Sequence, residues 1–418
     1  MSRRIFARIL LALTSFVFLT AHAVNNTPAA TPTVVATTPA PTAQPITQAP
    51  PVPTLNTSPT ARPNIIPTPP TLGSNGYILM DANTGAILAH KNMNTRMQPA
   101  SLTKLMTLYI ASEALARNQI KLTDEVPVTE RAWKTGGSRM FIKEGSKVTV
   151  QNLIDGIIVA SGNDACVALS QYVGGNEETF TQMMNQAAQQ LGMTNTHYVD
   201  STGLPDPQHY STPYDIAVLA RAIITQFPQD YTWYKQKWIT YNGIKQPNRN
   251  RLLWRDNAVD GLKTGHTQEA GYCLVSSAIR DGMRLIAVVM GSPTDEERAG
   301  DSEALFNWGF RFYQTHKLFD GEKALANPRV WLGRSKTVPV GLASPLYVTI
   351  QTGSYPELKP QVNMTDTLHA PIQKGQTVGT LNIMLQGKTI ATTSLIALKN
   401  DPKGNVFSRL WDRIVMVF

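Results

Sequence analysis

The stretch PASLTKLMTLYIASEAL, residues 99–115, places a serine and a lysine three positions apart at the start of an apolar run. Positions i and i+3 of a helix share a face, so the side chains of Ser101 and Lys104 can touch. The amino-terminal end of such a helix also offers free N–H groups and the positive end of the helix dipole. Taken alone, the pattern favours a serine that caps the helix and a lysine that faces water, so the rest of the chain must decide.

A second lysine, Lys263, can make the pair of Ser101 and Lys104 chemically reactive. A serine hydroxyl is a poor nucleophile until a base takes its proton, and Lys104 can take it only in the neutral form. Burial and a nearby cation both lower the pKa of a lysine, and Lys263 is a candidate for that cation. Ser101 is therefore a candidate nucleophile, and Lys104 is its candidate base.

Two later triplets, Ser161-Gly162-Asn163 and Lys263-Thr264-Gly265, fit the same chemistry. Ser161 can relay a proton to a leaving amine, and Asn163 can hold a substrate amide. The second triplet is expected just before a strand, whose edge would bind a peptide, and Gly265 would let the two backbones approach closely. Each triplet alone is typical of a turn or a strand start. The Ser101–Lys104 pair followed by these two triplets, in this order, indicates a serine enzyme.

The amino terminus predicts export. Residues 1–23 combine three arginines, an apolar segment at 9–19 and the small-x-small sequence Ala21-His22-Ala23, which is typical of a secretory signal rather than an uncleaved anchor. Removing its three arginines lowers the formal net charge from +9 to +6. This mild excess favours anionic surfaces such as lipid head groups. No basic helix with interleaved aromatic residues indicates a nucleic-acid partner.

Residues 24–72 are rich in Pro, Thr and Ala and nearly uncharged, which predicts an extended tether. A partner-binding motif or a glycosylated stalk is the alternative, and a spacer is favoured. The two cysteines, Cys166 and Cys273, are too few for a disulfide framework. They can pair in an oxidising compartment, but two small buried hydrophobic residues are the favoured interpretation.

Residues 73–316 have strand patterns towards both ends and helical patterns in the middle, which predicts an α+β domain. Apolar runs at 76–80 and 86–89 predict one hairpin, and runs at 271–279 and 284–291 predict another. The two hairpins can form one antiparallel sheet. Helical patterns lie at residues 101–115, 149–173, 176–192, 212–227 and 301–316. The second of these is expected to be two buried helices with a tight break at residues 161–163.

The carboxyl-terminal part changes texture twice. Residues 317–400 consist of short strand and turn patterns, which predict a small all-β domain without a nucleophile–base pair. Residues 401–418 predict an amphipathic helix, too short to span a membrane, that lies on its surface. The alternative is a helix docked on its own β-rich domain. The apolar face is expected to hold Val406, Phe407, Leu410, Trp411, Ile414 and Val417.

These motifs resemble those of penicillin-binding proteins and serine β-lactamases. The chain is most similar to one branch, the D-alanyl-D-alanine carboxypeptidases of the bacterial cell wall. The stretches that carry the resemblance are DANTGAIL, PASLTKLMT, ASGNDA, DSTGLPD, NRNRLLW, VDGLKTGHT and LFNWGFRF. The resemblance implies a transpeptidase-like or β-lactamase-like catalytic domain with an antiparallel sheet and helices. A small all-β domain and an amphipathic membrane helix would follow it.

The resemblance also implies roles for residues. Ser101 would be the acylated nucleophile and Lys104 its base, and the backbone N–H groups of Ser101 and His266 would form the oxyanion hole. Arg298 and Arg249 would bind substrate. The alternative is that each arginine is a solvated surface charge, and this alternative is less favoured for Arg298 than for Arg249. The implied catalytic residues are Ser101, Lys104, Ser161, Asn163 and Lys263. The implied substrate-binding residues are Thr264, Gly265, His266, Arg298 and Arg249.

The resulting expectation is a serine carboxypeptidase that removes the terminal D-alanine of a peptidoglycan stem pentapeptide and is inhibited covalently by β-lactams. It needs no metal or cofactor, and no H-E-x-x-H motif occurs. It is expected in the periplasm, attached to the inner membrane by its last helix. A β-lactamase or transpeptidase of the same fold, or a non-catalytic muropeptide-binding protein, remains the alternative.

Overall fold

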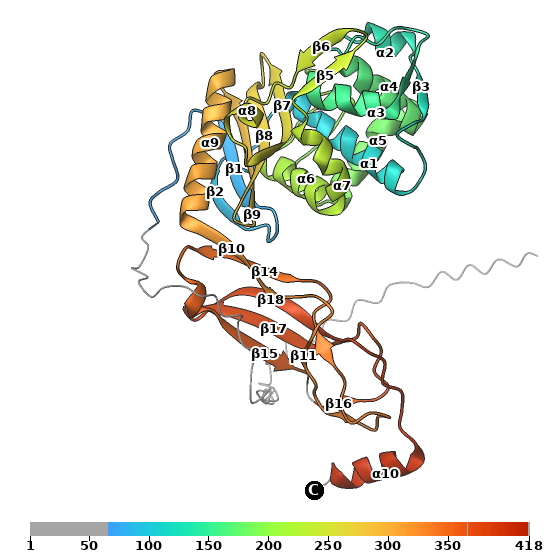
Figure 1. The fold of residues 1–418 in the computed structure, drawn as a ribbon, viewed down its shortest axis with the longest axis vertical. Coiled ribbons are helices and arrows are strands. Elements are labelled where there is room, and N and C mark those ends of the chain that lie inside the picture. Colours follow the sequence, from blue (N-terminus) through green and yellow to red (C-terminus); the bar gives the residue numbers. More distant parts are fainter. Residues whose placement is uncertain (1–65, 366, 417–418) are drawn as a thin grey trace, which may run out of the picture. The chain divides into compact units, whose positions relative to one another are not determined.

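The computed structural model describes residues 66–365 and 367–416. The predicted secretory signal and most of the predicted tether lie outside the described residues. A five-stranded antiparallel sheet in the order β2-β1-β9-β8-β7 organises the first domain (Figure 1). Pairing of β1 with β9 joins the two predicted hairpins into one sheet, which confirms that expectation. The strands are β1 (Gly76–Asp81), β2 (Ile87–Lys91), β7 (Val259–Thr267), β8 (Gly271–Arg280) and β9 (Met283–Ser292).

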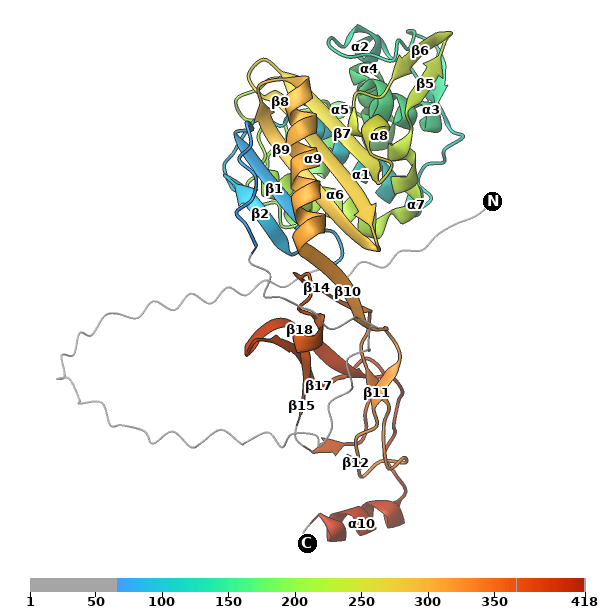
Figure 2. The ribbon, with the colours of Figure 1, turned by 60° about the vertical axis from the view of Figure 1, so that its left-hand side comes forward.

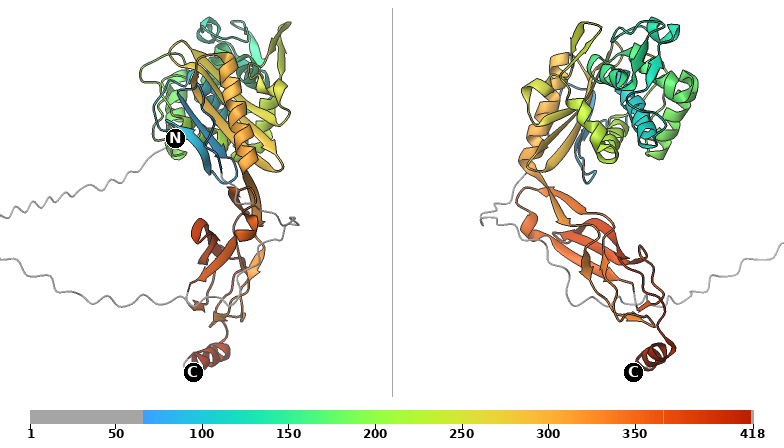
Figure 3. Two further views of the ribbon diagram at one scale, coloured as in Figure 1. Left: turned by 90° about the vertical axis from the view of Figure 1, so that its left-hand side faces the viewer. Right: turned by 45° about the vertical axis from the view of Figure 1, so that its right-hand side comes forward.

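Both faces of this sheet are buried, which explains why its inner strands are apolar at nearly every position. Successive side chains point to opposite faces, so Ile286 and Val288 pack among the helices while Ala287 and Val289 face the other way. The second face is covered by α9 (Asp295–Phe312), through residues such as Leu305 and Phe306. Figure 2 shows α9 across the sheet, and the right-hand view of Figure 3 shows the cyan and green helices on the opposite side.

The helical part supplies the elements that carry the site. The predicted helix at 149–173 is indeed divided, because a π-helical turn, Gly156–Ala160, ends at Ser161 in a left-handed conformation with φ of +58°. Helix starts follow ordinary capping, with Asn176 and Thr212 accepting backbone N–H bonds. The helices are α1 (Lys104–Ala116), α2 (Glu130–Lys134), α3 (Val150–Asp155), α4 (Asn163–Gly174), α5 (Glu177–Gln190), α6 (Pro213–Gln226), α7 (Pro228–Tyr231) and α8 (Leu252–Arg255).

Several elements differ from the sequence-based expectation. The triplet Lys263-Thr264-Gly265 lies inside β7 and not before a strand. Helix α9 begins earlier than predicted, because Thr294 caps its start by accepting from the backbone N–H of Glu297. The helix ends at Phe312. The border placed between residues 316 and 317 falls inside β10 (Tyr313–Phe319). Two small two-stranded sheets were not predicted: β3 (Glu125–Pro127) with β4 (Lys147–Thr149), and β5 (Trp238–Tyr241) with β6 (Ile244–Pro247).

The second domain is all-β, as predicted. Its main sheet has the strand order β11-β13-β18-β17-β15, and the pairs β10-β14 and β12-β16 lie beside it around a separate core. The remaining strands are β11 (Ala324–Ala326), β12 (Val330–Trp331), β13 (Val340–Gly341), β14 (Leu346–Gln351), β15 (Lys359–Met364), β16 (Leu368–His369), β17 (Thr377–Leu385) and β18 (Lys388–Ala397).

The described chain ends in α10 (Val406–Val415), which Asn405 caps. Its polar side faces the β-rich domain, because the Asp412 carboxylate accepts from the backbone N–H of Leu332 at 2.7 Å. Its apolar residues are exposed, with Phe407 at 84% and Trp411 at 67%. Val417, which was predicted on the same face, lies outside the described residues. None of the helices between residues 66 and 416 has the length and apolarity that a membrane crossing needs.

Candidate active site

Ser101 lies in a tight turn and not at a helix cap. The turn is a 3-10 segment, Ala100–Thr103, that runs into α1, and Ala100 has an unusual positive φ of +47° for a residue other than glycine. The Ser101 hydroxyl accepts a hydrogen bond from Nζ of Lys104 at 2.9 Å. The predicted side-chain contact between the two residues is therefore present, and the simple capping interpretation is wrong.

Lys104 is fully buried, which sets its acid–base properties. Its Nζ donates to Ser101 and, at 2.7 Å, to the backbone carbonyl of Thr202. Burial, the largest effect, and the Arg249 cation together lower the pKa of Lys104 to about 8, against the opposing effect of the Asp200 carboxylate. A neutral fraction of Lys104 is therefore available near neutral pH, as a base for Ser101 requires.

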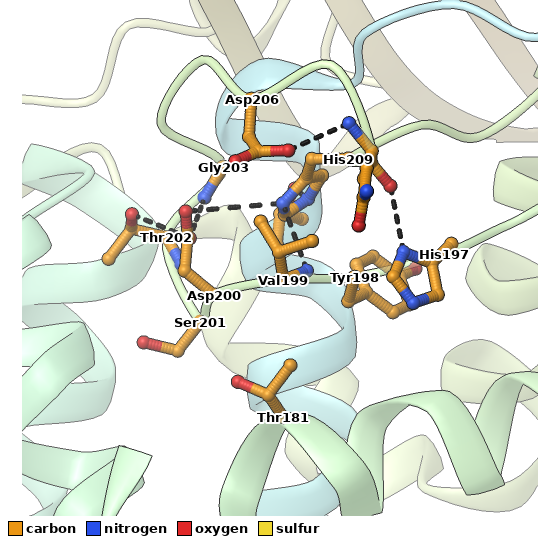
Figure 4. A network of polar contacts seen from close by, with 12 residues as sticks. Thr181, His197, Tyr198, Val199, Asp200, Ser201, Thr202, Gly203, Asp206 and His209 are labelled. Atoms are coloured by element: carbon orange, nitrogen blue, oxygen red, sulfur yellow. Dashed lines mark hydrogen bonds and ion pairs between the residues drawn. The ribbon is translucent and has the colours of Figure 1, made fainter. Parts of the chain in front are cut away.

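The loop that presents the Thr202 carbonyl is held by Asp200 (Figure 4). Its Oδ1 accepts from the backbone N–H and the hydroxyl of Thr202 at 2.6 and 2.9 Å, and from the N–H of Gly203 at 2.7 Å. Gly203 has φ of +86°, and a Cβ added there would stand 1.8 Å from the carbonyl oxygen of Ala100. Only glycine allows this loop to pack so closely against the turn that carries Ser101.

A buried histidine joins this loop to the start of α1. Nε2 of His209 lies 2.8 Å from the hydroxyl of Thr103. Nδ1 of His209 lies 4.0 Å from the Asp200 carboxylate (Figure 4). Burial lowers the pKa of His209, so the imidazole is neutral at neutral pH. Asp200 and His209 were not singled out from the sequence, although the stretch DSTGLPD was.

Lys263 and Ser161 form a second serine–lysine pair. Nζ of Lys263 donates to the Ser161 hydroxyl at 2.9 Å and to the carbonyl of Thr264 at 2.8 Å. Burial lowers the pKa of Lys263 well below its ordinary value, and the Lys104 cation lowers it further. The sequence had predicted that Lys263 depresses the pKa of Lys104. In the structure Lys104 depresses the pKa of Lys263, and the cation that lowers the pKa of Lys104 is Arg249.

Asn163 and its neighbour fix the loop beside the cleft. The Asn163 side chain donates through Nδ2 to the carbonyl of Gly136 at 2.7 Å, which ties residues 136–138 to the start of α4. The Asp164 carboxylate accepts backbone N–H bonds from Met140, Phe141 and Ile142. Asp164 was not predicted as a site residue, because a carboxylate that receives only backbone donors leaves no side-chain pattern in the sequence.

Strand β7 forms the edge of the sheet next to the nucleophile. A Cβ added to Gly265 would stand 3.0 Å from the carbonyl oxygen of Pro99 and 3.3 Å from the backbone nitrogen of Ser101. At Gly265 the strand therefore approaches the serine turn closely, whereas the predicted approach of a bound peptide to Gly265 stays a prediction. The imidazole of His266 is exposed and lies 4.0 Å from the ring of Tyr272, centroid to centroid.

These parts meet in one cleft of about 470 Å³. Arg298 is 5% exposed, and its NH1 donates to the carbonyls of Gly265 and Cys273 at 3.0 and 3.4 Å. Its NH2 pairs with Asp295, which sequence reasoning did not identify. Arg249 donates to the Ser138 hydroxyl at 2.7 Å. The lining includes Ser101, Ser138, Ser161, Arg249, Thr264, Gly265, His266, Asp295 and Arg298, whereas Lys104, Asn163 and Lys263 support it from behind.

The arrangement is suited to acyl transfer. It joins a serine with a buried lysine, a second serine–lysine pair, a strand edge for a peptide and a guanidinium for an anion. Both cysteines are buried and unpaired, as favoured from the sequence. Within residues 66–365 and 367–416, no three His, Cys, Asp or Glu side chains gather in a way that can hold a metal ion.

Comparisons with known proteins agree with this geometry. Residues 64–294 match the family described as D-alanyl-D-alanine carboxypeptidase, and residues 313–403 match the carboxyl-terminal domain of penicillin-binding protein 5. D-alanyl-D-alanine carboxypeptidase DacC of Escherichia coli (strain K12) is 44% identical over 357 residues, which cover 84% of this chain and 89% of that protein.

Two solved structures are informative. Penicillin-binding protein 5 from Haemophilus influenzae is 42% identical, with a TM-score of 0.77, and the match covers 80% of this chain and 99% of that one. Penicillin-binding protein D2 from Listeria monocytogenes, in an ampicillin-bound form, is 30% identical with a TM-score of 0.53. That match covers 57% of this chain and 98% of the other.

Proposed function

The chain belongs to the D-alanyl-D-alanine carboxypeptidase family, and we propose that it hydrolyses the terminal D-alanine from peptidoglycan stem pentapeptides by way of an acyl-enzyme on Ser101. The observation that carries the proposal is the distance of 2.9 Å between Oγ of Ser101 and Nζ of the buried Lys104. The second pair, Ser161 and Lys263, lies at the same cleft and supplies the proton for the leaving group.

Acylation uses both pairs. Neutral Lys104 takes the proton from Ser101, and Oγ bonds to the carbonyl carbon of the penultimate D-alanine. As the tetrahedral intermediate collapses, the C–N bond to the terminal D-alanine breaks. The leaving nitrogen receives a proton from the Ser161 hydroxyl, and the Lys263 ammonium gives a proton to Ser161 in return. Free D-alanine departs, and the rest of the peptide is held as an ester on Ser101.

In deacylation a water molecule is the nucleophile and Ser101 is the leaving group. A proton returned from Lys104 to Lys263 through solvent restores both lysines. A water molecule then gives a proton to Lys104 as its oxygen bonds to the acyl carbon, and the ester bond to Ser101 breaks. Ser101 recovers its proton from Lys104, and the shortened peptide leaves with a free carboxyl group.

Binding depends on the strand edge and the arginines. The peptide lies along β7, with its scissile carbonyl oxygen toward the backbone N–H groups of Ser101 and His266. The close approach between Gly265 and the Ser101 turn supports this placement. The carboxylate of the terminal D-alanine pairs with Arg298, since a desolvated guanidinium is a strong partner for a carboxylate. Asn163 and Thr264 support the amide side of the peptide.

The experiment compares wild-type protein with Ser101→Ala. Purified wild type is incubated with a pentapeptide substrate and with fluorescent penicillin, and mass spectrometry follows D-alanine release. We expect release and stable labelling in wild type and neither in Ser101→Ala. A label lost within seconds would indicate a β-lactamase, crosslinked product a transpeptidase, and binding without acylation a muropeptide-binding protein.

We propose a location for the protein from two of its segments. Residues 1–23 direct export and are removed, and the enzyme works in the periplasm. Helix α10 attaches it to the inner membrane through its exposed apolar residues, and the arginines of the helix meet lipid head groups. The exposure of Phe407 and Trp411, together with the polar contact of Asp412 to Leu332, supports this orientation over docking of the apolar face on the β-rich domain.

A further inference from the structure

A carboxylate of the protein itself lies on the arginine that is proposed to receive the substrate. Asp295 is the first residue of α9 and lines the cleft. One of its carboxylate oxygens pairs with NH2 of Arg298, and the other lies 2.5 Å from Nε of Arg251. Asp295 therefore bridges a buried arginine and a half-exposed one, whose side chains are 6% and 49% exposed.

The remaining contacts of Arg298 restrict where a second anion can bind. NH1 already donates to the carbonyls of Gly265 and Cys273, and the ring of Tyr272 lies 5.4 Å from the guanidinium carbon. Asp295 occupies one donor position of NH2, the terminal nitrogen that does not bond to Gly265 or Cys273. A substrate carboxylate that approaches NH2 is a like charge beside the Asp295 carboxylate, so the two anions repel each other and compete for this nitrogen.

Arg251 offers Asp295 an alternative partner. It already contacts the second oxygen of Asp295, and its NH1 lies 2.9 Å from Glu296. Glu296 in turn pairs with Arg255 and not with Arg298. If the substrate takes NH2 of Arg298, Asp295 can keep its charge paired by staying on Arg251, so the exchange does not leave a carboxylate without a cation.

We propose that Asp295 is a specificity-determining residue, which occupies the carboxylate position on Arg298 in the free enzyme and is displaced toward Arg251 when a substrate with a terminal carboxylate binds. The inference rests on the proposed function, because it needs a substrate that ends in a free carboxylate. Its consequence is a weakened apparent affinity for such substrates. Ligands without a carboxylate cannot make the exchange, so Asp295 should not affect them in the same way.

The test substitution removes the charge of Asp295 while keeping the shape of its side chain. Asp295→Asn should lower KM for diacetyl-Lys-D-Ala-D-Ala by about three- to tenfold, because the competing charged hydrogen bond is lost, with little change in kcat. Glu296→Gln is the matched control, since it removes the same charge from the adjacent residue without touching Arg298. It should leave KM within twofold. Thermal unfolding of each variant checks the fold.

A double-mutant cycle separates competition from general electrostatics. Arg251→Gln should raise KM in the wild-type background and leave it unchanged in Asp295→Asn, because Arg251 acts through Asp295. Acylation by benzylpenicillin should accelerate in Asp295→Asn, whereas acylation by its methyl ester should not.

The outcomes distinguish the two claims. An active Asp295→Asn whose KM is unchanged or higher would overturn the inference and leave the proposed function standing. An equal effect of Arg251→Gln in both backgrounds would also overturn it, because Arg251 would then bind substrate directly. Wild-type protein that releases no D-alanine would overturn the proposed function, and this inference with it.

Discussion

The ionisation of Lys104 is the residue property on which acylation depends. Because its pKa is lowered to about 8, the neutral form gains about tenfold for each pH unit below that value and then reaches a plateau. We therefore expect kcat/KM for D-alanine release to rise with pH and level off above an apparent pKa near 8. A stopped assay at pH values below and above this apparent pKa measures the rising limb of the pH profile.

Arg249 provides the internal check on that pH profile. Its positive charge lowers the pKa of Lys104, so Arg249→Gln should move the rising limb to higher pH, whatever the loss in plateau height. A limb that stays at the same pH in the variant would contradict the electrostatic role of Arg249. The plateau height separately reports any lost contact with substrate.

Arg298 is expected to contribute more to catalysis than to folding. A hydrogen bond between charged groups contributes about 1.5–3 kcal/mol, so Arg298→Ala should lower kcat/KM by about ten- to a hundredfold. Since Arg298 also holds the carbonyl of Gly265, Arg298→Lys serves as a comparison that keeps the charge. Unchanged kcat/KM in Arg298→Ala would show that the substrate carboxylate binds elsewhere.

At the scale of elements, the contact between the 200–206 loop and the Ser101 turn is the most sensitive to a single methyl group. Gly203→Ala introduces an unfavourable left-handed alanine, which costs about 1–2 kcal/mol, and also a clash with the backbone oxygen of Ala100. We expect a larger loss of stability than this range, together with a large fall in kcat. Denaturant unfolding and steady-state kinetics measure both.

Gly192→Ala is the matched control for that substitution. Gly192 has φ of +77°, close to that of Gly203, but nothing lies within 4 Å of an added Cβ. It should therefore show the conformational cost alone and retain activity. If Gly203→Ala and Gly192→Ala were equally stable and equally active, the close packing of the loop against the serine turn would have no functional importance.

The elements that the sequence predicted well are those with strong local patterns. The hairpin of β8 and β9 follows from two apolar runs around Asp281-Gly282, and α6 follows from Thr212 with Pro213. The sequence did not predict that Lys263 lies within strand β7, because a lysine between glycines lacks the usual strand composition. Its pairing with β8 supplies the stability that local propensity does not.

The same distinction applies to the site. Ser101 and Lys104 are three residues apart, so helical geometry alone predicted their contact. The second partner of Lys104 is a backbone carbonyl, that of Thr202, which carries no side-chain signal and lies 98 residues away. Asp295 was missed for a related reason: within DEER it is typical of a negatively charged helix start, and only the fold brings it to Arg298.

For the whole molecule, catalysis and membrane attachment are expected to be separable. Deleting residues 406–418 removes the exposed apolar face of α10 and should abolish sedimentation with phosphatidylglycerol vesicles, while activity on short peptides is unchanged. A cut after Asn400 would be less suitable, because it also removes the buried Asp401, which bonds to the backbone of Ile372 and Ser335.

A substitution control keeps the helix in place. Ser408→Ala changes the less exposed side of α10 and should still sediment, whereas Trp411→Ser should weaken vesicle binding. If the protein without residues 406–418 sediments as well as the full chain, the membrane contact lies elsewhere.

The central claim is that Ser101, activated by Lys104, carries the acyl group. The most direct measurement is mass spectrometry of the protein after reaction with benzylpenicillin, followed by peptide mapping, on wild type and Ser101→Ala. We expect one penicilloyl group on the peptide that contains Ser101, and neither adduct nor D-alanine release in the folded variant. An adduct on another residue, or D-alanine release that persists in Ser101→Ala, would contradict the account.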